Sequence, residues 1–200
     1  MLDCKEVSRE SLKKYVQEMH GPLIVQHKVE GHPDLQNINP DSLNTIRAIT
    51  LSWKGEVYYL GAIARFGRNG IRVDNTHAGG VFALASMQLY NMCHKSPGFL
   101  DAGFKKFSSH PDSNVTFDVE SLRMKMILRN KLPEFVVSLH AKYSQIGLIG
   151  WDVVPDGDGF VIIEANSKVP TIWSLQLMQG PVIPEDILSD IYSSCVTSSC

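Results

Sequence analysis

The sequence predicts an α+β fold that consists of a mainly antiparallel sheet with flanking helices packed on one side. Two strand–turn–strand patterns predict the sheet: residues 44–66 turn at Lys54-Gly55, and residues 146–166 turn at Asp156–Gly159. Between these hairpins, Pro133–Tyr143 places apolar residues at helical spacing. Hairpins separated by a helix, in place of regularly alternating strands and helices, favour an antiparallel sheet over a doubly wound parallel one.

The rest of the chain adds shorter elements, and residues 1–200 are expected to form one domain because 200 residues suit a single core. Helical spacing predicts a first helix that ends at Met19, where Gly21-Pro22 stops it. The other expected elements, in chain order, are a strand at 23–29, a polar loop at 30–42, strands at 80–86 and 88–93, a loop at 95–121, and helices at 172–179 and 184–194.

Composition and charge exclude several classes of function. The net charge of −2 and the pI of about 6.4 give no sign of binding to nucleic acid or to an anionic membrane. No uncharged apolar run reaches the roughly 20 residues of a membrane span, and the first residues lack the apolar core of a signal peptide. Four cysteines without metal-ligand spacing indicate ordinary reduced thiols. We therefore expect a cytoplasmic protein.

The second hairpin carries the strongest chemical signal. Side chains alternate between the faces of a strand, so Glu164 and Asn166 point the same way, and pairing about the turn brings Asp152 opposite or nearly opposite Glu164. Two carboxylates and one amide oxygen suit Mg²⁺, which keeps positions open for substrate phosphates. Alternatively, these side chains simply face solvent. Their apolar neighbours favour the metal site, because a buried carboxylate needs a partner.

Asp152, Glu164 and Asn166, in this spacing, resemble the metal-binding end of the ATP-grasp fold, where such residues hold two Mg²⁺ ions against the phosphates of ATP. The sequence of residues 149–154 and 159–167 is most similar to the sugar-transfer-associated ATP-grasp proteins, which are also called hexapeptide-transferase-like. The resemblance covers about residues 22–180. Other segments fit it in order, namely Val25–Val29, Leu43–Arg47, Arg72–Asn75 with Gly79-Gly80, and His110-Pro111.

The resemblance implies an adenine-binding hinge at Gln26–Val29. The main-chain groups of His27 and Val29 would pair with adenine, and Glu30 or His32 would lie near the ribose. Alternatively, this segment is a plain edge strand and loop. The family also has a strand-borne lysine and a glycine-rich lid before the hinge, and neither is found here. The chain is therefore expected to be the C-terminal part of an ATP-grasp module, with poor ATP affinity by itself.

Three polar residues are candidates for the phosphate side of the site. Arg47 shares a strand face with Thr45 and Ile49, and its planar group suits a phosphate or carboxylate, unless it forms a salt bridge to a buried acid. The resemblance places Arg72 and Asn75 near the γ-phosphate and a carboxylate substrate, with Arg65 and Arg68 as alternatives to Arg72.

The resemblance implies an ATP- and Mg²⁺-dependent (or Mn²⁺-dependent) ligase of sugar, polysaccharide or cell-surface metabolism. In that reaction a carboxylate would be activated as an acyl phosphate, and the expected partners are ATP and a small carboxylate or sugar substrate. Two alternatives remain: phosphoryl transfer to a hydroxyl, and a non-catalytic nucleotide-binding module or inactive fragment.

Overall fold

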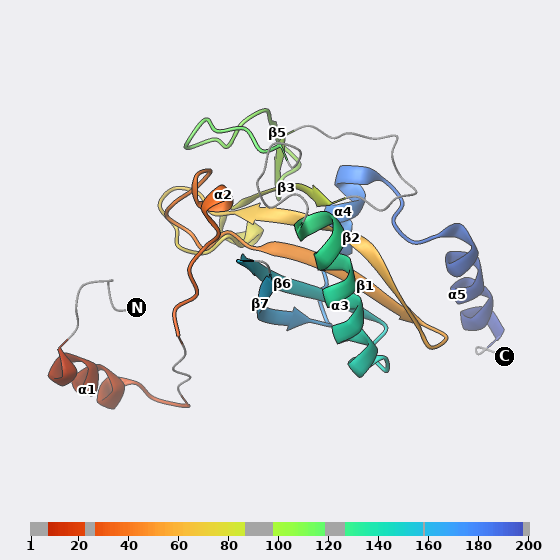
Figure 1. Ribbon diagram of the computed structural model, residues 1–200, viewed down its shortest axis with the longest axis horizontal. Coiled ribbons are helices and arrows are strands. Elements are labelled where there is room, and N and C mark those ends of the chain that lie inside the picture. The colour runs from red at the N-terminus through yellow and green to blue at the C-terminus, as the bar shows by residue number, and fades with distance from the viewer. Residues whose placement is uncertain (1–7, 23–26, 87–97, 119–126, 158, 198–200) are drawn as a thin grey trace.

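The computed structural model describes residues 8–22, 27–86, 98–118, 127–157 and 159–197. Its centre is a seven-stranded sheet with the order β5-β4-β3-β2-β1-β6-β7, in which every neighbouring pair is antiparallel (Figure 1). This arrangement confirms the predicted α+β class. The strands are β1 (Ile46–Trp53), β2 (Glu56–Phe66), β3 (Val81–Ser86), β4 (Phe99–Asp101), β5 (Lys106–Phe107), β6 (Leu148–Asp156) and β7 (Gly159–Asn166).

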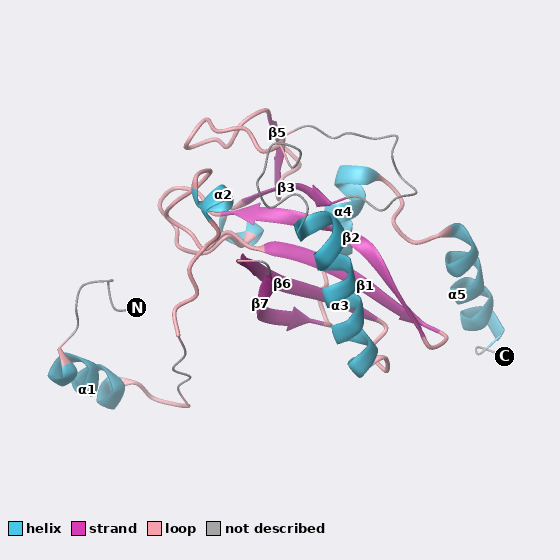
Figure 2. Ribbon diagram, in the orientation of Figure 1, coloured by secondary structure: helices cyan, strands magenta, loops and turns pink. Residues whose placement is uncertain are grey.

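Figure 2 shows helices beside this sheet, and two of the described helices precede its first strand in the chain. The described helices are α1 (Arg9–Glu18), α2 (Pro33–Gln36), α3 (Leu132–His140), α4 (Ile172–Gln179) and α5 (Glu185–Thr197), with short 3₁₀ turns at η1 (Thr76–Ala78) and η4 (Ala141–Tyr143) and a π-helical turn at η3 (Ile127–Lys131). None of the described helices is long and apolar enough to cross a membrane.

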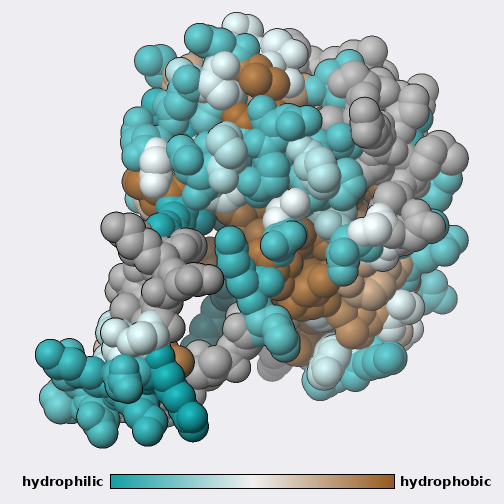
Figure 3. Space-filling view, turned by 60° about the vertical axis from the view of Figure 1, so that its left-hand side comes forward, coloured by the Kyte–Doolittle hydropathy of each residue, from teal (hydrophilic) through white to brown (hydrophobic). Residues whose placement is uncertain are grey.

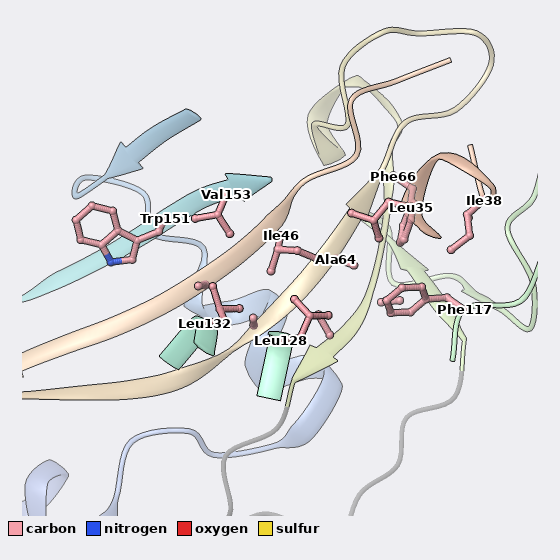
Figure 4. Packing of buried hydrophobic residues seen from close by; sticks show 14 of the residues in the cluster. Leu35, Ile38, Ile46, Ala64, Phe66, Phe117, Leu128, Leu132, Trp151 and Val153 are labelled. Atoms are coloured by element: carbon pink, nitrogen blue, oxygen red, sulfur yellow. The ribbon is translucent and has the colours of Figure 1, made fainter. Parts of the chain in front are cut away.

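The prediction that helices pack on one side of the sheet is wrong. Ile46 and Ala48 of β1 belong to a buried cluster that includes Leu132 of α3 (Figure 4). Ile49 and Leu51 of the same strand belong to a second cluster with Leu175 and Met178 of α4. Because β1 is apolar on both of its faces, each face needs its own helix. The sheet is therefore covered by α3 on one face and by α4 on the other.

Three other expectations differ from the structure. The predicted polar loop contains α2, which Pro33 begins and in which Leu35 is fully buried. The predicted loop at 95–121 contains β4 and β5, which extend the sheet by five residues in total. Residues 27–29, the described end of the strand expected at 23–29, have no regular structure. The strand expected at 88–93 lies outside the described residues.

His110 receives a physical role that its sequence did not suggest. Its ring is fully buried, and Nε2 donates a hydrogen bond to the carbonyl oxygen of Gly67 at 2.9 Å. The ring also meets the edges of Phe66 and Phe99, with centroid distances of 6.3 and 5.7 Å. His110 thereby fixes the loop after β5 against the end of β2.

The N-terminal helix α1 is separate from this core. Ser8 caps it by accepting a hydrogen bond from the Ser11 amide, and none of its residues is buried. In Figure 3 it projects from the rest of the chain and presents a mostly hydrophilic face, while Leu12 and Val16 are exposed as well. The predicted helix is confirmed, but it contributes nothing to the packing of the sheet.

Candidate functional site

A cleft of about 590 Å³ opens on the α4 side of the sheet, beside the first residues of β1. Its floor is formed by side chains of β1, β2, β6 and β7. Its walls are the loop at 72–78 and the segment that enters α4. The lining residues are Leu43, Thr45, Arg47, Ile63, Arg65, Arg72, Val73, Asp74, Asn75, Thr76, His77, Ala78, Asp152, Ile163, Glu164, Asn166, Val169, Thr171 and Ser174.

A β-bulge turns the polar end of β7 into this cleft. Asp152 pairs directly with Glu164, but the next residue of β6, Val153, pairs with Ile162, so β7 carries one extra residue at Ile163. Ile162 packs against the α3 side of the core. In a regular strand Ile162 and Glu164 would share a face. The bulge instead places Glu164 on the same face as Asp152.

Asn166 lies on this face as well, because it pairs with Gly150 two residues before Asp152. Paired residues of an antiparallel ladder project from the same face, with β-carbons about 4.5–5.5 Å apart. The three residues predicted to bind metal therefore line one cleft. Alternation along β7 places Glu164 and Asn166 on one face, and the bulge makes this the face of Asp152.

Asp152 is almost fully buried, with 4% of its surface exposed, and two arginines surround its carboxylate. Arg47 donates from Nε to Oδ1 and from Nη2 to Oδ2, the latter at 3.0 Å. Arg65 Nη2 lies 3.0 Å from Oδ2 as well. Asn166 Nδ2 donates to the same oxygen at 3.4 Å. The structure thus contains the salt bridge to a buried acid that the sequence left open for Arg47.

Arg47 also holds the segment that leads into α4. Its Nη1 donates to Thr171 Oγ1 at 2.5 Å. Thr171 has a left-handed backbone, with φ of +63°, directly before the first residue of α4. Gly150 of β6 lets this segment and the Arg47 side chain lie close to the strand. A β-carbon at this position would lie 2.5 Å from the Pro170 carbonyl oxygen and 3.0 Å from Arg47 Cδ.

Arg65 is held on its other side by Thr45 and Asp74. Thr45 Oγ1 accepts from Arg65 Nε at 3.1 Å and from Nη2 at 2.8 Å. Asp74 Oδ1 lies 3.3 Å from Nη2, and Asp74 Oδ2 accepts from the Thr45 amide and hydroxyl at 2.7 and 2.6 Å. Within the described part of the chain, Nη1 of Arg65 has no acceptor, so it remains a donor for the cleft.

Arg47, Arg65, Asp74 and Asp152 together form a buried group that we call the arginine–aspartate cluster. Its two positive and two negative charges cancel. The cluster joins β1, β2 and β6 to the loop at 72–78 and to the segment before α4. Of its members, sequence analysis selected Arg47 and Asp152 and named Arg65 only as an alternative. Asp74 gave no signal, because nothing local indicates that it is buried.

Glu164 and Asn166 supply the accessible oxygens of the cleft. Glu164 is exposed, and no described side chain is paired with its carboxylate. The amide oxygen of Asn166 likewise has no described hydrogen-bond donor, since its recorded contact is through Nδ2. No group of three or more His, Cys, Asp or Glu residues forms a metal cluster within the described ranges. The hard-oxygen set of two carboxylates and one amide nevertheless fits Mg²⁺, which takes only a few protein ligands beside phosphates.

Arg72 and Asn75 line the wall of the cleft that the loop at 72–78 forms. The side-chain oxygen of Asn75 accepts from the His77 amide at 3.0 Å and thereby caps η1, which leaves its amide NH₂ group as a donor. Gly80 closes the same loop tightly, because a β-carbon there would lie 2.7 Å from the Asp74 carbonyl oxygen. The Arg72 and Asn75 side chains are exposed to the cleft.

The residues predicted for the adenine hinge are not brought to this cleft. His27, Val29 and Glu30 do not line it, and Gln26 lies outside the described residues. His27 and Glu30 are exposed, and Val29 is partly buried. Their adenine-binding role remains a prediction.

Comparison with known proteins adds one positive finding. A family model for sugar-transfer-associated ATP-grasp proteins matches residues 11–190. This match spans every residue of the cleft and agrees with the resemblance based on residues 149–167. Searches of curated proteins and of solved structures found no match.

Proposed function

The chain belongs to the sugar-transfer-associated ATP-grasp family, and from that membership we propose that it acts as an ATP- and Mg²⁺-dependent carboxylate ligase in sugar or polysaccharide metabolism. Membership supports an ATP-grasp-type function and ATP binding. The ligase reaction, the carboxylate substrate and the cytoplasmic location are our own extension.

The observation that carries the proposal is that accessible carboxylate and amide oxygens line the same cleft as several arginines. The polyphosphate tail of ATP carries about four negative charges, and it enters a partly dry site only with cationic partners. Glu164 and Asn166, with Asp152, would hold Mg²⁺. Arg47 and Arg72 would contact the phosphates, and the Asn75 amide would donate to the transferred group. When bound, Mg²⁺ (or Mn²⁺) supplies charge neutralisation and orientation of the phosphate oxygens.

The proposed reaction has two balanced steps. A carboxylate oxygen of the substrate attacks the γ-phosphorus, the bond to the bridging oxygen breaks, and ADP leaves with the electron pair. An amine or other nucleophile then attacks the carbonyl carbon of the acyl phosphate and expels inorganic phosphate, and the proton of the nucleophile passes to solvent. Arg72 and Asn75 stabilise the charge on the transferred phosphoryl oxygens by fixed hydrogen-bond donors.

Oxygen-isotope transfer tests this function directly. The protein is incubated with ATP, Mg²⁺ and a panel of sugar acids and amino acids whose carboxylates carry ¹⁸O, and ADP and phosphate are measured. A carboxylate ligase places ¹⁸O in the released phosphate, and added hydroxylamine traps the acyl group as a hydroxamate. Formation of ADP with a phosphate ester and no inorganic phosphate would indicate phosphoryl transfer to a hydroxyl instead. Nucleotide binding without turnover would indicate a binding module.

A matched pair of variants ties turnover to the cleft. Glu164→Gln removes an accessible carboxylate of the cleft and is expected to abolish Mg²⁺-dependent turnover. Asp112→Asn removes a carboxylate that pairs with Arg68 outside the cleft lining, and it is expected to leave turnover unchanged. Equal losses in both variants would separate the activity from the cleft.

A further inference from the structure

We propose that Asp152 changes partners when the cleft is loaded, so that polyphosphate and metal bind cooperatively. In the structure it pairs with Arg47 and Arg65. When polyphosphate and metal are bound, the two arginines donate to phosphate oxygens, and the Asp152 carboxylate binds the metal instead. This inference rests on the proposed function, since it concerns how the same cleft takes up its ligands.

The Oδ2 oxygen of Asp152 has no spare acceptor capacity. A carboxylate offers about four lone-pair positions for hydrogen bonds. Asp152 uses Oδ1 for Arg47 Nε, and it uses Oδ2 for Arg47 Nη2, Arg65 Nη2 and Asn166 Nδ2. Oδ1 keeps one lone pair beside its bond from Arg47 Nε, whereas a metal ion can bind Oδ2 only if at least one donor leaves that oxygen.

Arg47 and Arg65 need other acceptors before they can leave the Asp152 carboxylate. The side chains of Arg47 and Arg65 are 6% and 14% exposed, so water does not readily replace the lost carboxylate. An uncompensated charge at such a depth is strongly unfavourable. A polyphosphate in the cleft offers replacement oxygens, and Arg65 Nη1 is already available to meet them. Phosphate oxygens suit this exchange, because guanidinium groups bind them as they bind carboxylates.

The charge of the cleft as a whole also bears on binding. The arginine–aspartate cluster is neutral, so polyphosphate alone adds anions that nothing offsets, and metal alone adds a cation beside two guanidinium groups. Together the two ligands offset each other. Each ligand therefore raises the affinity of the other, and the effect is reciprocal by thermodynamic linkage.

Inorganic tripolyphosphate without metal is the first probe, measured by calorimetry in excess EDTA. We expect Asp152→Asn to bind it about tenfold more tightly than wild type, within the roughly 5- to 150-fold range of coupled sites. Glu164→Gln is the matched control, because it removes the same charge from the same cleft, and Glu164 pairs with no arginine among the described residues. The control is expected to change the affinity less than about threefold. Equal gains in both variants, or no gain in Asp152→Asn, would overturn the proposal.

The reciprocal probe is Mn²⁺ alone, counted by electron paramagnetic resonance. We expect Arg65→Met to bind Mn²⁺ about tenfold more tightly than wild type, because it releases one oxygen of Asp152. Arg68→Met is the control, since Arg68 pairs with Asp112 outside the cleft lining. Unchanged or weaker Mn²⁺ binding in Arg65→Met refutes the exchange even if Asp152→Asn does not fold.

The two probes separate this proposal from the proposed function. If wild type binds ATP with Mg²⁺ but neither variant shows the expected gain, the partner exchange fails while the ATP-dependent function stands. If wild type shows no Mg²⁺-dependent ATP binding, the proposed function fails, and the two variants still report whether Asp152 and the arginines compete for the added ions.

Discussion

Replacing Asp152 by asparagine is a sharp perturbation of the cleft, because it removes one charge and almost no volume. The native carboxylate pairs with both the Arg47 and the Arg65 guanidinium groups. Removing one partner of a buried ion pair leaves the other charge uncompensated, which destabilises a protein by about 3–5 kcal/mol. The substitution therefore measures how far the arginine–aspartate cluster holds the sheet together in the absence of ligand.

Two contacts place the expected loss near the lower end of this range. Arg65 keeps Asp74 at 3.3 Å, and Arg47 keeps the hydroxyl of Thr171 at 2.5 Å. We therefore expect Asp152→Asn to lose about 3 kcal/mol of unfolding free energy. For a chain of 200 residues this loss corresponds to a fall in Tm of about 6–12 °C.

Urea unfolding within a double-mutant cycle is the assay. If Arg47 and Asp152 act on each other, Arg47→Met combined with Asp152→Asn loses less stability than the sum of the single variants, by about 1–3 kcal/mol. Asp112→Asn serves as the control, because it breaks a partly exposed pair with Arg68 and should change stability by less than about 1 kcal/mol. An Asp152→Asn protein as stable as wild type would refute the reasoning. The attraction between the carboxylate and the arginines would then only offset the cost of burying the charge.

Four further predictions follow from particular contacts. Glu164→Gln should change the unfolding free energy by less than about 0.5 kcal/mol, because Glu164 is exposed, yet calorimetry should show loss of Mg²⁺-dependent ATP binding. Arg72→Ala should weaken the binding of ATP with Mg²⁺ by roughly 10- to 100-fold, the effect of one charged hydrogen bond, and unchanged affinity would remove Arg72 from the phosphate side. Gly150→Ala should lose about 1–3 kcal/mol, because its β-carbon would lie 2.5 Å from the Pro170 carbonyl oxygen, whereas Gly147→Ala has open space and should be nearly neutral in the same unfolding assay. The hydrogen bond from Lys54, and next the one from Trp53, lowers the pKa of Asp190 below its ordinary value of 3.8. The stability that this carboxylate contributes is therefore present above pH 3.8 and is lost as the pH falls through the lowered pKa of the folded state. In acid unfolding, wild type and Asp190→Asn should converge in stability below that lowered pKa.

The hairpins could be predicted from sequence because their signals are local. Lys54-Gly55 makes a two-residue turn, and the flanking residues alternate or run apolar, so the pairing of β1 with β2 follows directly. The same logic placed Asp152 opposite or nearly opposite Glu164, and the bulge at Ile163, which was not predicted, sets the exact pairing. The helix at 172–179 was predicted, but its position on the second face of the sheet was not predictable in this way. The apolar character of β1 on both faces is visible in the sequence, but the helix that covers Ile49 lies more than 120 positions later in the chain.

The arginine–aspartate cluster escaped prediction for a related reason. Arg47 and Asp152 are 105 positions apart, and Thr45 and Asp74 are 29 apart, so no local pattern links either pair. Asp74 stands in a glycine- and arginine-rich stretch that reads as an ordinary surface loop. Its burial follows from the amide and hydroxyl of Thr45, which satisfy one of its oxygens once the loop folds back on the sheet.

The bulge at Ile163 shows how packing and ligand binding are reconciled on one strand. β7 must place Ile162 against the core beside α3, and only two residues later it must place Glu164 in the cleft on the opposite face. A regular strand cannot satisfy both requirements, since residues two apart share a face. One extra residue between them changes the phase of the alternation at the point where β6 presents Asp152. The orientation of Glu164 and Asn166 toward the cleft therefore depends on the register between β6 and β7, and a substitution that removed the bulge would turn both oxygens away from the cleft without touching either residue.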